Sequence, residues 1–439
     1  MTPKHPRDVT RRAFVETTAA ATAALALPLS RQAPSIARRA TQTLRIALIG
    51  CGGRGTGAAK DCLTSSENVE LVALGDLFPD HLTKCRENLA TMATEDPTLK
   101  PKIKVKDSQC FTGFDAYRKV LESNADLVLL ATPPAFRARH LAAAIDAGKH
   151  VFMEKPVAVD PQGVHAVLAS ADLAAQKSLA IVAGTQRRHD AGYRAAMERI
   201  HSGAIGDLVA AEVYWNQGGL WMKPREPAWS DVEWQIRNWL YFTWLSGDHI
   251  VEQHIHNIDV ANWAFGAHPV KAIAVGGRQR RTDPAYGHIF DHFAVEFEYP
   301  SGARLRSMCR QQDGTASRVG ERFVGTRGTS DGHSVIAGAA AWSWDPQAPK
   351  VNPYVQEHAD LVASIRAGRP LNEGRQVAES TLTAIMGREA AYTGQEVTWD
   401  ELLSCPLDLV PADVQFGPMP VPPVAMPGQT ILARSWRSA

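Results

Sequence analysis

The sequence has almost no excess of charge of either sign, and it has no long apolar run. Its net charge is +1, so nothing indicates a protein that binds nucleic acid electrostatically. No apolar run reaches the roughly 20 residues that a helix needs to span a bilayer. No Cys-x-x-Cys pair occurs, and the spacing of the six cysteines fits neither a zinc site nor a small disulfide framework. They are Cys51, Cys62, Cys85, Cys110, Cys309 and Cys405.

The N-terminal segment of the sequence looks like a targeting signal. Arg11 and Arg12 are followed by Phe14 and by an alanine-rich apolar run at residues 19–29. A basic start before a short apolar stretch is typical of a secretory signal, and the arginine pair resembles a twin-arginine export signal. A disordered basic tail is the alternative. We therefore expect residues 1–40 to direct export and to lie outside the fold, and the mature protein to be periplasmic or extracellular.

A glycine-rich turn follows the first predicted strand. Residues 43–49, TLRIALI, predict a strand, and GCGGRG follows at once. Gly50, Gly52 and Gly55 fit G-x-G-x-x-G, in which glycines permit a tight turn, approach of a pyrophosphate and packing of the next helix. A second predicted strand, VELVALGD, ends at Asp76. A carboxylate there accepts hydrogen bonds from the adenosine ribose and repels a 2′-phosphate, so NAD is expected rather than NADP, unless Asp76 is only a turn residue.

Strands and helices continue to alternate beyond this turn. Residues 125–131 form an apolar run that predicts a strand covered on both faces, and a predicted helix follows at residues 137–147. The next predicted strand, at residues 150–153, ends at Glu154, Lys155 and Pro156. Because ligands of open α/β sheets bind at the carboxyl ends of the strands, we expect Lys155 to lie over a cleft.

The glycine turn, Thr132-Pro133-Pro134 and Glu154-Lys155-Pro156 together resemble the Gfo/Idh/MocA family of sugar and polyol oxidoreductases. The resemblance implies an α/β Rossmann domain at residues 41–158 that binds NAD. It implies an α+β domain at residues 159–400 with a large, mostly antiparallel open sheet, whose bare face joins subunits of a homo-oligomer, a dimer or a tetramer. A proline-rich arm over the surface or a neighbouring subunit is expected at residues 401–439. The cofactor-binding residues expected are Gly50, Cys51, Gly52, Gly53, Arg54, Gly55, Asp76, Thr132, Pro133, His140, Glu154, Lys155 and Gln186.

The stretch GDHIVEQHIHNIDVANW, residues 247–263, holds further catalytic candidates. The family typically carries Asp-x-Gly-x-His-x-x-Asp here, which places Glu252 at the first acid position and His254 where glycine is usual. The resemblance implies that Lys155, Glu252 and His256 surround the reacting carbon. A histidine takes up the hydroxyl proton near neutral pH, and a lysine ammonium group stabilises the developing oxyanion.

Two other interpretations of this stretch stay open. Glu252, His254 and His256 offer a carboxylate and two imidazoles, a ligand set that suits zinc, although alternate residues diverge on a helix. A purely structural role is the other interpretation. We commit to the catalytic interpretation without a metal, and we expect Asp259 to contact backbone or an arginine.

Substrate contacts are expected from two further groups. Arg187 and Arg188 follow a predicted strand at a position that faces nicotinamide and substrate in similar proteins, although solvated basic residues fit equally well. Seven of the eleven tryptophans lie between Trp215 and Trp263, and such rings stack on the C–H faces of sugars. For any single tryptophan, core packing is the alternative. The substrate-binding residues expected are Arg187, Arg188, Trp215, Asn216, Arg237, Asn238 and His254.

These features predict an exported NAD-dependent enzyme that oxidises a secondary hydroxyl group of a sugar, polyol or glycoside. Outside the cytoplasm no nicotinamide pool reoxidises NADH, so we expect NAD to stay bound and to be recycled internally. A redox-neutral glycosidase or lyase acting through a transient keto-sugar is the first alternative, with His254 or His256 as the additional base. A non-catalytic, exported sugar-binding protein is the second.

Overall fold

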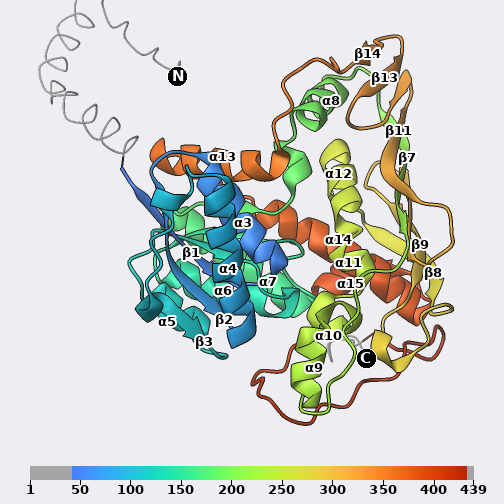
Figure 1. Ribbon diagram of the computed structural model, residues 1–439. Coiled ribbons are helices and arrows are strands. Elements are labelled where there is room, and N and C mark those ends of the chain that lie inside the picture. Colours follow the sequence, from blue (N-terminus) through green and yellow to red (C-terminus); the bar gives the residue numbers. More distant parts are fainter. Residues whose placement is uncertain (1–41, 433–439) are drawn as a thin grey trace, which may run out of the picture. The chain divides into compact units, whose positions relative to one another are not determined.

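Residues 42–432 are described by the computed structural model of the chain (Figure 1). The expected export signal at residues 1–40 and the last part of the arm, residues 433–439, lie outside the described residues, so export stays a prediction. Within residues 42–432, none of the helices combines the length and the apolar character needed to cross a membrane.

The first sheet has six parallel strands in the order β3-β2-β1-β4-β5-β6. All four positions of β4 are buried, as expected for a strand that is covered on both faces. The order reverses between β1 and β4, and ligands of such sheets bind at the carboxyl ends of the strands there. The Rossmann prediction is therefore confirmed. The strands are β1 (Leu44–Ile49), β2 (Val69–Asp76), β3 (Cys110–Thr112), β4 (Leu127–Leu130), β5 (His150–Met153) and β6 (Ile181–Ala183).

Helices from distant parts of the chain cover the two faces of this sheet. One face packs on α3, α4 and α13, and the other packs on α5, α6 and α7. The predicted boundary at residue 158 and the assignment of residues 353–366 to the second domain alone therefore need correction. The sheet extends past residue 158 to Ala183, and α13 returns from the second domain to place Leu361 and Val362 against the first sheet. The helices are α3 (Gly53–Ser65), α4 (Pro79–Glu95), α5 (Ala116–Leu121), α6 (Pro134–Asp146), α7 (Pro161–Gln176) and α13 (Pro353–Arg366).

The second sheet has nine strands in the order β14-β13-β12-β11-β7-β10-β9-β8-β15. Neighbouring strands are antiparallel except β7 and β10. In β9 and β10 buried residues alternate with less buried ones, so one face packs and the other is open, as predicted. The strands are β7 (Leu208–Gln217), β8 (Lys271–Gly277), β9 (His292–Glu298), β10 (Arg304–Gln311), β11 (Arg318–Gly325), β12 (Gly328–Ser330), β13 (Val335–Gly338), β14 (Trp342–Ser343) and β15 (Val397–Thr398).

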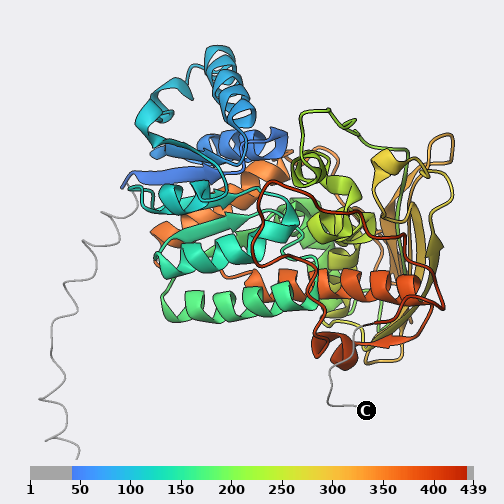
Figure 2. The same cartoon turned by 90° about the horizontal axis from the view of Figure 1, so that it is seen from below.

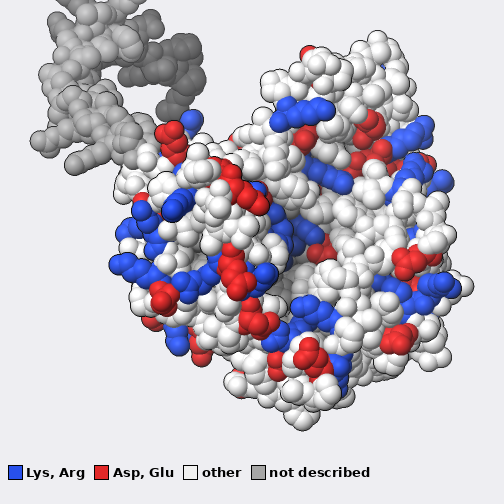
Figure 3. All heavy atoms as spheres, in the orientation of Figure 1, with Lys and Arg blue, Asp and Glu red and all other residues white. Residues whose placement is uncertain are grey.

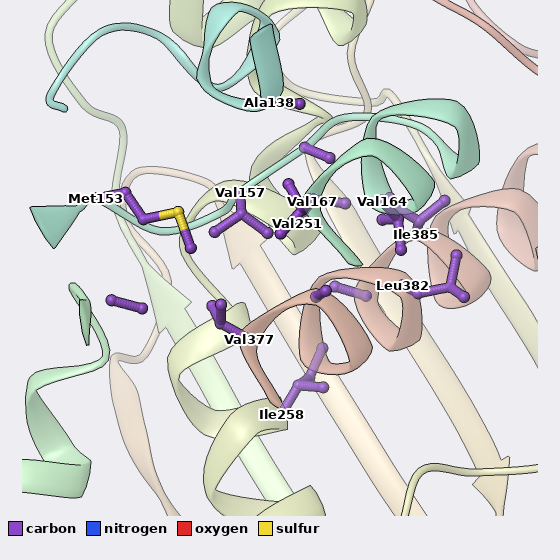
Figure 4. Packing of buried hydrophobic residues seen from close by; sticks show 14 of the residues in the cluster. Ala138, Met153, Val157, Val164, Val167, Val251, Ile258, Val377, Leu382 and Ile385 are labelled. Atoms are coloured by element: carbon purple, nitrogen blue, oxygen red, sulfur yellow. The ribbon is translucent and has the colours of Figure 1, made fainter. Parts of the chain in front are cut away.

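A long helix, α14 (Gly374–Thr393), joins the two sheets into one core. It packs on α7 of the first domain and on β8 and β9 of the second (Figure 1). Figure 4 shows Val377, Leu382 and Ile385 of α14 among side chains from both domains. The shared core gives the ends of the parallel strands a fixed position beside the second domain. The other α-helices of residues 42–432 are α8 (Ala191–His201), α9 (Asp231–Arg237), α10 (Thr243–Ser246), α11 (His249–Glu252), α12 (Ile255–Phe265) and α15 (Trp399–Leu403).

Candidate active site

A cavity of about 530 Å³ opens at the carboxyl ends of β1, β2 and β4. Its walls come from the glycine turn, from the ends of these strands, from α4 and α6, and from α9 with the residues on either side of it. In Figure 3, lysine and arginine side chains gather along a hollow between the region of α3 and α4 and the region of α11 and α12. Residues around the cavity include Gly52, Asp76, Phe114, Thr132, Trp221 and Trp239.

The glycine turn leaves room for a ligand at two positions and none at two others. Gly50 has a φ of +99°, and a methyl group at Gly55 would lie 1.8 Å from the Gly50 carbonyl oxygen, so both positions require glycine. A methyl group at Gly52 or Gly53 would meet no protein atom within 4 Å, and both residues line the cavity. Because these glycines begin α3, its free N–H groups and positive dipole end lie at the cavity. The turn therefore fits a dinucleotide pyrophosphate.

Asp76 serves the glycine turn and faces the cavity at the same time. Its Oδ2 accepts a hydrogen bond of 2.6 Å from the Cys51 N–H, and its Oδ1 accepts one of 2.8 Å from the Phe78 N–H. It also lies 3.4 Å from His81 Nδ1. A carboxylate at this strand end fits a ribose, and its contacts with the turn show why the position is structurally constrained as well.

Arg54 links the glycine turn to the end of β5 and to α13. It pairs with Glu154, and it lies 3.5 Å from Glu357 and 4.8 Å from the centre of the Tyr354 ring. Burial disfavours the charge of Arg54, but Glu154 and Glu357 outweigh this effect and raise its pKa. Gln186 Nε2 donates to Tyr354 Oη over 3.1 Å. Residues from four parts of the chain thus lie together beside the glycine turn.

The segment after β4 is held by buried side chains of α6. Thr132 and Pro133 line the cavity, and the buried Arg137 donates hydrogen bonds to the carbonyl oxygens of Thr132 and Pro156. Thr132 Oγ1 lies 3.3 Å from His140 Nδ1. Burial, together with nearby arginine charges, lowers the pKa of His140 to about 3, so this ring is neutral.

Lys155 and Glu252 meet where β5 ends beside α11, and His256 follows in the first turn of α12, near enough for the Lys155 charge to lower its pKa. Lys155 Nζ donates to the Glu252 carbonyl oxygen over 2.5 Å and to Glu252 Oε1 over 3.0 Å. Both side chains are largely buried, with exposed fractions of 13% and 12%. Glu252 is the last residue of α11, and the helix is interrupted at Gln253 before α12 begins at Ile255. This interruption allows Glu252 and His256 to contribute to one site.

His256 is held as a neutral imidazole. Its ring stacks on Trp215 with centroids 5.7 Å apart. Burial first, and then the charges of Lys155, Arg187 and Arg54, hold its pKa well below the ordinary value. A neutral imidazole close to a lysine ammonium group is able to accept a proton from a hydroxyl group.

Two family descriptions match consecutive parts of the chain. Residues 44–183 match the NAD-binding Rossmann fold of the oxidoreductase family GFO/IDH/MocA, and residues 193–330 match the GFO/IDH/MocA C-terminal domain. The chain belongs to the Gfo/Idh/MocA family.

Among relatives of this Gfo/Idh/MocA chain are inositol dehydrogenases. Inositol 2-dehydrogenase 3 of Saccharopolyspora erythraea is 33% identical over 42% of this chain and 47% of its own length. Inositol 2-dehydrogenase of Serratia proteamaculans is 29% identical over 60% of this chain and 66% of its own length. The chain thus spans about half to two thirds of the length of these curated relatives.

Solved structures share the family fold over nearly their full length. Apo scyllo-inositol dehydrogenase from Lactobacillus casei has a TM-score of 0.61 at 20% identity, covering 81% of this chain and 98% of that one. The aldose-aldose oxidoreductase from Caulobacter crescentus has the same score and identity, with 81% and 99% covered. At this identity the likeness concerns the fold alone.

His254 does not lie in the site, contrary to the expectation for this family member. The side chain is fully buried, and its Nε2 lies 2.8 Å from Ser307 Oγ on β10. Glu252 is engaged with Lys155, so Glu252, His254 and His256 do not form one ligand set. Within residues 42–432 no group of three His, Cys, Asp or Glu residues is arranged to hold a metal ion. The additional base that favoured the redox-neutral alternative is also lost.

Four other residues that were expected to contact substrate have other partners or positions in the structure. Arg188 pairs with Asp259 through bonds of 2.8 and 2.9 Å, which agrees with the arginine partner predicted for Asp259. Asn238 is fully buried and donates to the Ala285 carbonyl oxygen. Arg237 lines the cofactor cavity and pairs with Asp80. Asn216 follows Trp215 on β7, so it faces the other side of the sheet.

The tryptophan cluster divides between the core and the cofactor cavity. Trp234 and Trp244 are buried in an apolar cluster, and the Trp244 indole N–H donates to Gln235 over 2.8 Å. Trp221 and Trp239 line the cavity. Trp215 alone of this group stacks on His256, so the expected sugar-binding wall is reduced to one ring.

Two residues of the site were absent from the sequence-based candidates. Glu357 and Tyr354 approach Arg54 from α13, about 300 positions away along the chain. Neither belongs to a local motif. A buried carboxylate 303 positions from its arginine leaves no signal in a single sequence.

Proposed function

We propose that this chain transfers hydride between NAD and a secondary hydroxyl group of a sugar or polyol. The observation that carries the proposal is the pairing of Lys155 and Glu252 at the end of β5, with the neutral His256 nearby. Relatives named as inositol dehydrogenases support this reaction class. A panel of inositols, aldoses and disaccharides, scored by nicotinamide absorbance, tests the proposal. No absorbance change with any member, in protein that carries NAD, contradicts it.

The side chains divide the work of alcohol oxidation between them. His256, held neutral, accepts the proton of the hydroxyl group. The Lys155 ammonium group donates a hydrogen bond to the same oxygen and stabilises its negative charge. Glu252 holds Lys155 in place through two hydrogen bonds. A bound nicotinamide ring supplies the hydride acceptor.

The pH dependence of oxidation tests the role of His256. Its pKa is held below the ordinary value of about 6.5, so the acid limb of kcat/KM should lie below that pH. Arg187 contributes to this lowering, so Arg187→Gln should shift the acid limb to higher pH. Arg188→Gln is the matched control, because Arg188 is paired with Asp259 and is not among the groups that lower the His256 pKa. Equal shifts in both variants, or none in either, would contradict His256 as the proton acceptor.

NAD rather than NADP is proposed as the cofactor because of the Asp76 carboxylate. Asp76→Asn removes the charge and keeps an oxygen that accepts the Cys51 N–H, while the acceptor of the Phe78 N–H is replaced by an amide NH2 group. We expect the affinity for NADP to rise roughly tenfold relative to the affinity for NAD, which corresponds to about 1.4 kcal/mol. This is a fraction of the roughly 4 kcal/mol by which two unit charges 4 Å apart near a protein surface interact. The dissociation constants of both dinucleotides for cofactor-stripped protein measure this ratio. An unchanged ratio would show that Asp76 serves only the glycine turn.

The enzyme is proposed to be exported with NAD bound and to recycle it in each cycle. The arginine pair and apolar run of residues 1–40 support export through a route that carries folded proteins.

The C-terminal segment supports the retention of bound NAD. After α15 it runs extended over the chain itself (Figure 2), and Phe416 contacts the rings of Phe78 and Phe114, which line the cavity. This placement fits a strap across the adenosine end of the cavity.

Retention predicts that purified mature protein releases nearly one NAD(H) per chain when it is denatured. Phe416→Ala removes the ring that contacts both cavity-lining phenylalanines, so the NAD(H) content after gel filtration should fall several-fold. Val421→Ala, farther along the same segment, should leave the content unchanged. An empty wild-type protein would mean an exchangeable cofactor and would remove the reason for internal recycling.

A second copy of the chain is proposed to cover the open face of the second sheet. Val275, Ala294, Met308 and Tyr214 form one row across four strands. Val275 is 71% and Met308 42% exposed. The next row alternates in charge, with Glu296, Arg306, Glu212 and Arg322, so two such faces are able to complement each other. The molar mass in solution tests this association.

A further inference from the structure

A second pocket lies beside the catalytic residues, on the packed side of the nine-stranded sheet. Its volume is about 470 Å³, and β11, α8 and the turn between β12 and β13 provide its walls. Val319 of this pocket is the register partner of Trp215 on the neighbouring strand. Partners in an antiparallel pair point to the same face. Trp215 stacks on His256, so the pocket begins one strand beyond the catalytic imidazole.

A buried carboxylate connects the pocket to the site. The Glu321 side chain is 2% exposed, pairs with Arg187, and accepts hydrogen bonds from Tyr193 Oη at 3.1 Å and from Asn257 Nδ2 at 2.7 Å. The Arg187 guanidinium lies 5.8 Å from the Trp215 ring and 5.6 Å from the Tyr193 ring. Arg187 thus contacts both the Trp215 ring, which stacks on His256, and the Tyr193 ring, which lines the pocket.

The charges that line the pocket nearly cancel, because Arg318 and Asp331 have opposite signs and the other charged groups are paired within the protein. Glu321 is neutralised by Arg187, and His333 Nε2 lies 3.1 Å from Asp190 Oδ1. Asp331 accepts hydrogen bonds from the backbone N–H groups of the turn that follows it. Tyr193 and Val319 add apolar surface. Apolar faces combined with hydrogen-bonding groups that carry little net charge suit a neutral, hydroxyl-rich ring better than an anion.

We propose that this pocket binds a second ring of the substrate, so that the preferred substrate is a neutral two-ring saccharide rather than a free inositol or monosaccharide. This inference rests on the proposed function, because the first ring must lie at His256 and Lys155. Neighbouring strands are about 4.8 Å apart, a step comparable to the width of one sugar ring. A ring linked to the reacting sugar therefore reaches the space beside Val319 and Glu321.

The test fills the pocket without touching the catalytic residues. Val319 is 49% exposed, so Val319→Trp adds an indole to the pocket with little demand on the core. We expect kcat/KM for cellobiose and maltose to fall at least tenfold, and kcat/KM for glucose and myo-inositol to stay within twofold of wild type. Val209→Trp is the matched control, because Val209 is 47% exposed near the opposite end of β7 from Trp215. It should leave both substrate classes unchanged.

A second variant and a binding measurement keep the inference testable if Val319→Trp unfolds or if no probe is turned over. His333→Ala removes one wall of the pocket and should weaken the two disaccharides selectively. Calorimetric titration of NAD-loaded protein should show tighter binding of disaccharides than of single rings, and Val319→Trp should abolish that difference. Failure of all turnover with selective disaccharide binding would reject the proposed reaction but keep the pocket. Equal losses for one-ring and two-ring probes would overturn the inference.

Discussion

Lys155→Met is expected to lower kcat for alcohol oxidation roughly 100- to 1000-fold, the range seen when one donor to a developing oxyanion is removed. Methionine keeps the length and apolar stem of lysine but has no ammonium group. The hydroxyl oxygen then loses its hydrogen-bond donor, and Glu252 Oε1 loses its partner at 3.0 Å. Because Lys155 is paired with Glu252 and does not line the cavity, the NAD(H) content of the variant should stay near that of the wild type.

Lys149→Met is the matched control for this substitution. Lys149 immediately precedes β5 at its opposite end, and its Nζ donates to the carbonyl oxygens of Ser123 and Ala125. This control should retain turnover within a few-fold and should share any general cost of removing a lysine from this strand. Binding of the sugar to Lys155→Met, measured by calorimetry, separates two outcomes. Lost turnover with retained binding supports an enzyme, whereas full turnover in Lys155→Met would contradict the proposed role of the ammonium group.

Sequence predicted the positions of the residues that strand ends fix, whereas their roles in the site stay predictions. Asp76 and Lys155 both follow apolar strands of a parallel sheet, and such ends meet at one edge. Gly50 and Gly55 were predictable for a related reason, because a tight turn and a close helix packing both exclude a side chain. Glu252 and His256 depended on the resemblance to a family pattern, since nothing in their local spacing distinguishes a catalytic pair from two polar residues of a helix.

The less successful predictions concern polar residues whose partners are distant in the chain. His254 and Asn238 looked like surface groups available to a sugar, yet both are fully buried, with partners at Ser307 and Ala285. Burial of a polar group is tolerated when hydrogen bonds satisfy it, and those partners depend on the tertiary fold. For the same reason the sequence did not predict Glu357 as a site residue, because its position beside Arg54 depends on the packing of α13 on the first sheet.

A substitution in the glycine turn is expected to have a similarly large effect on the affinity for NAD. Gly52→Ala should weaken NAD binding roughly 10- to 100-fold while the melting temperature stays nearly unchanged. The backbone at Gly52 has a φ of −68°, which alanine adopts freely, and the added methyl group meets no protein atom within 4 Å. The space that it fills is the cavity itself, where the pyrophosphate is expected. Forcing a methyl group into a filled site costs about 1 to 3 kcal/mol, and each 1.4 kcal/mol is about tenfold in affinity.

Gly57→Ala separates this effect from a general change in α3. Gly57 lies in the same helix, and a methyl group there would meet only the Arg54 side chain at an ordinary 3.6 Å. Alanine is favoured over glycine inside a helix by about 1 kcal/mol, so this control should bind NAD normally and melt slightly higher. Titration of cofactor-stripped proteins with NAD, paired with their melting curves, gives both quantities. Normal NAD affinity in Gly52→Ala would mean that the dinucleotide backbone does not pass over this turn, and the placement of the nicotinamide beside Lys155 and His256 would then lose its basis.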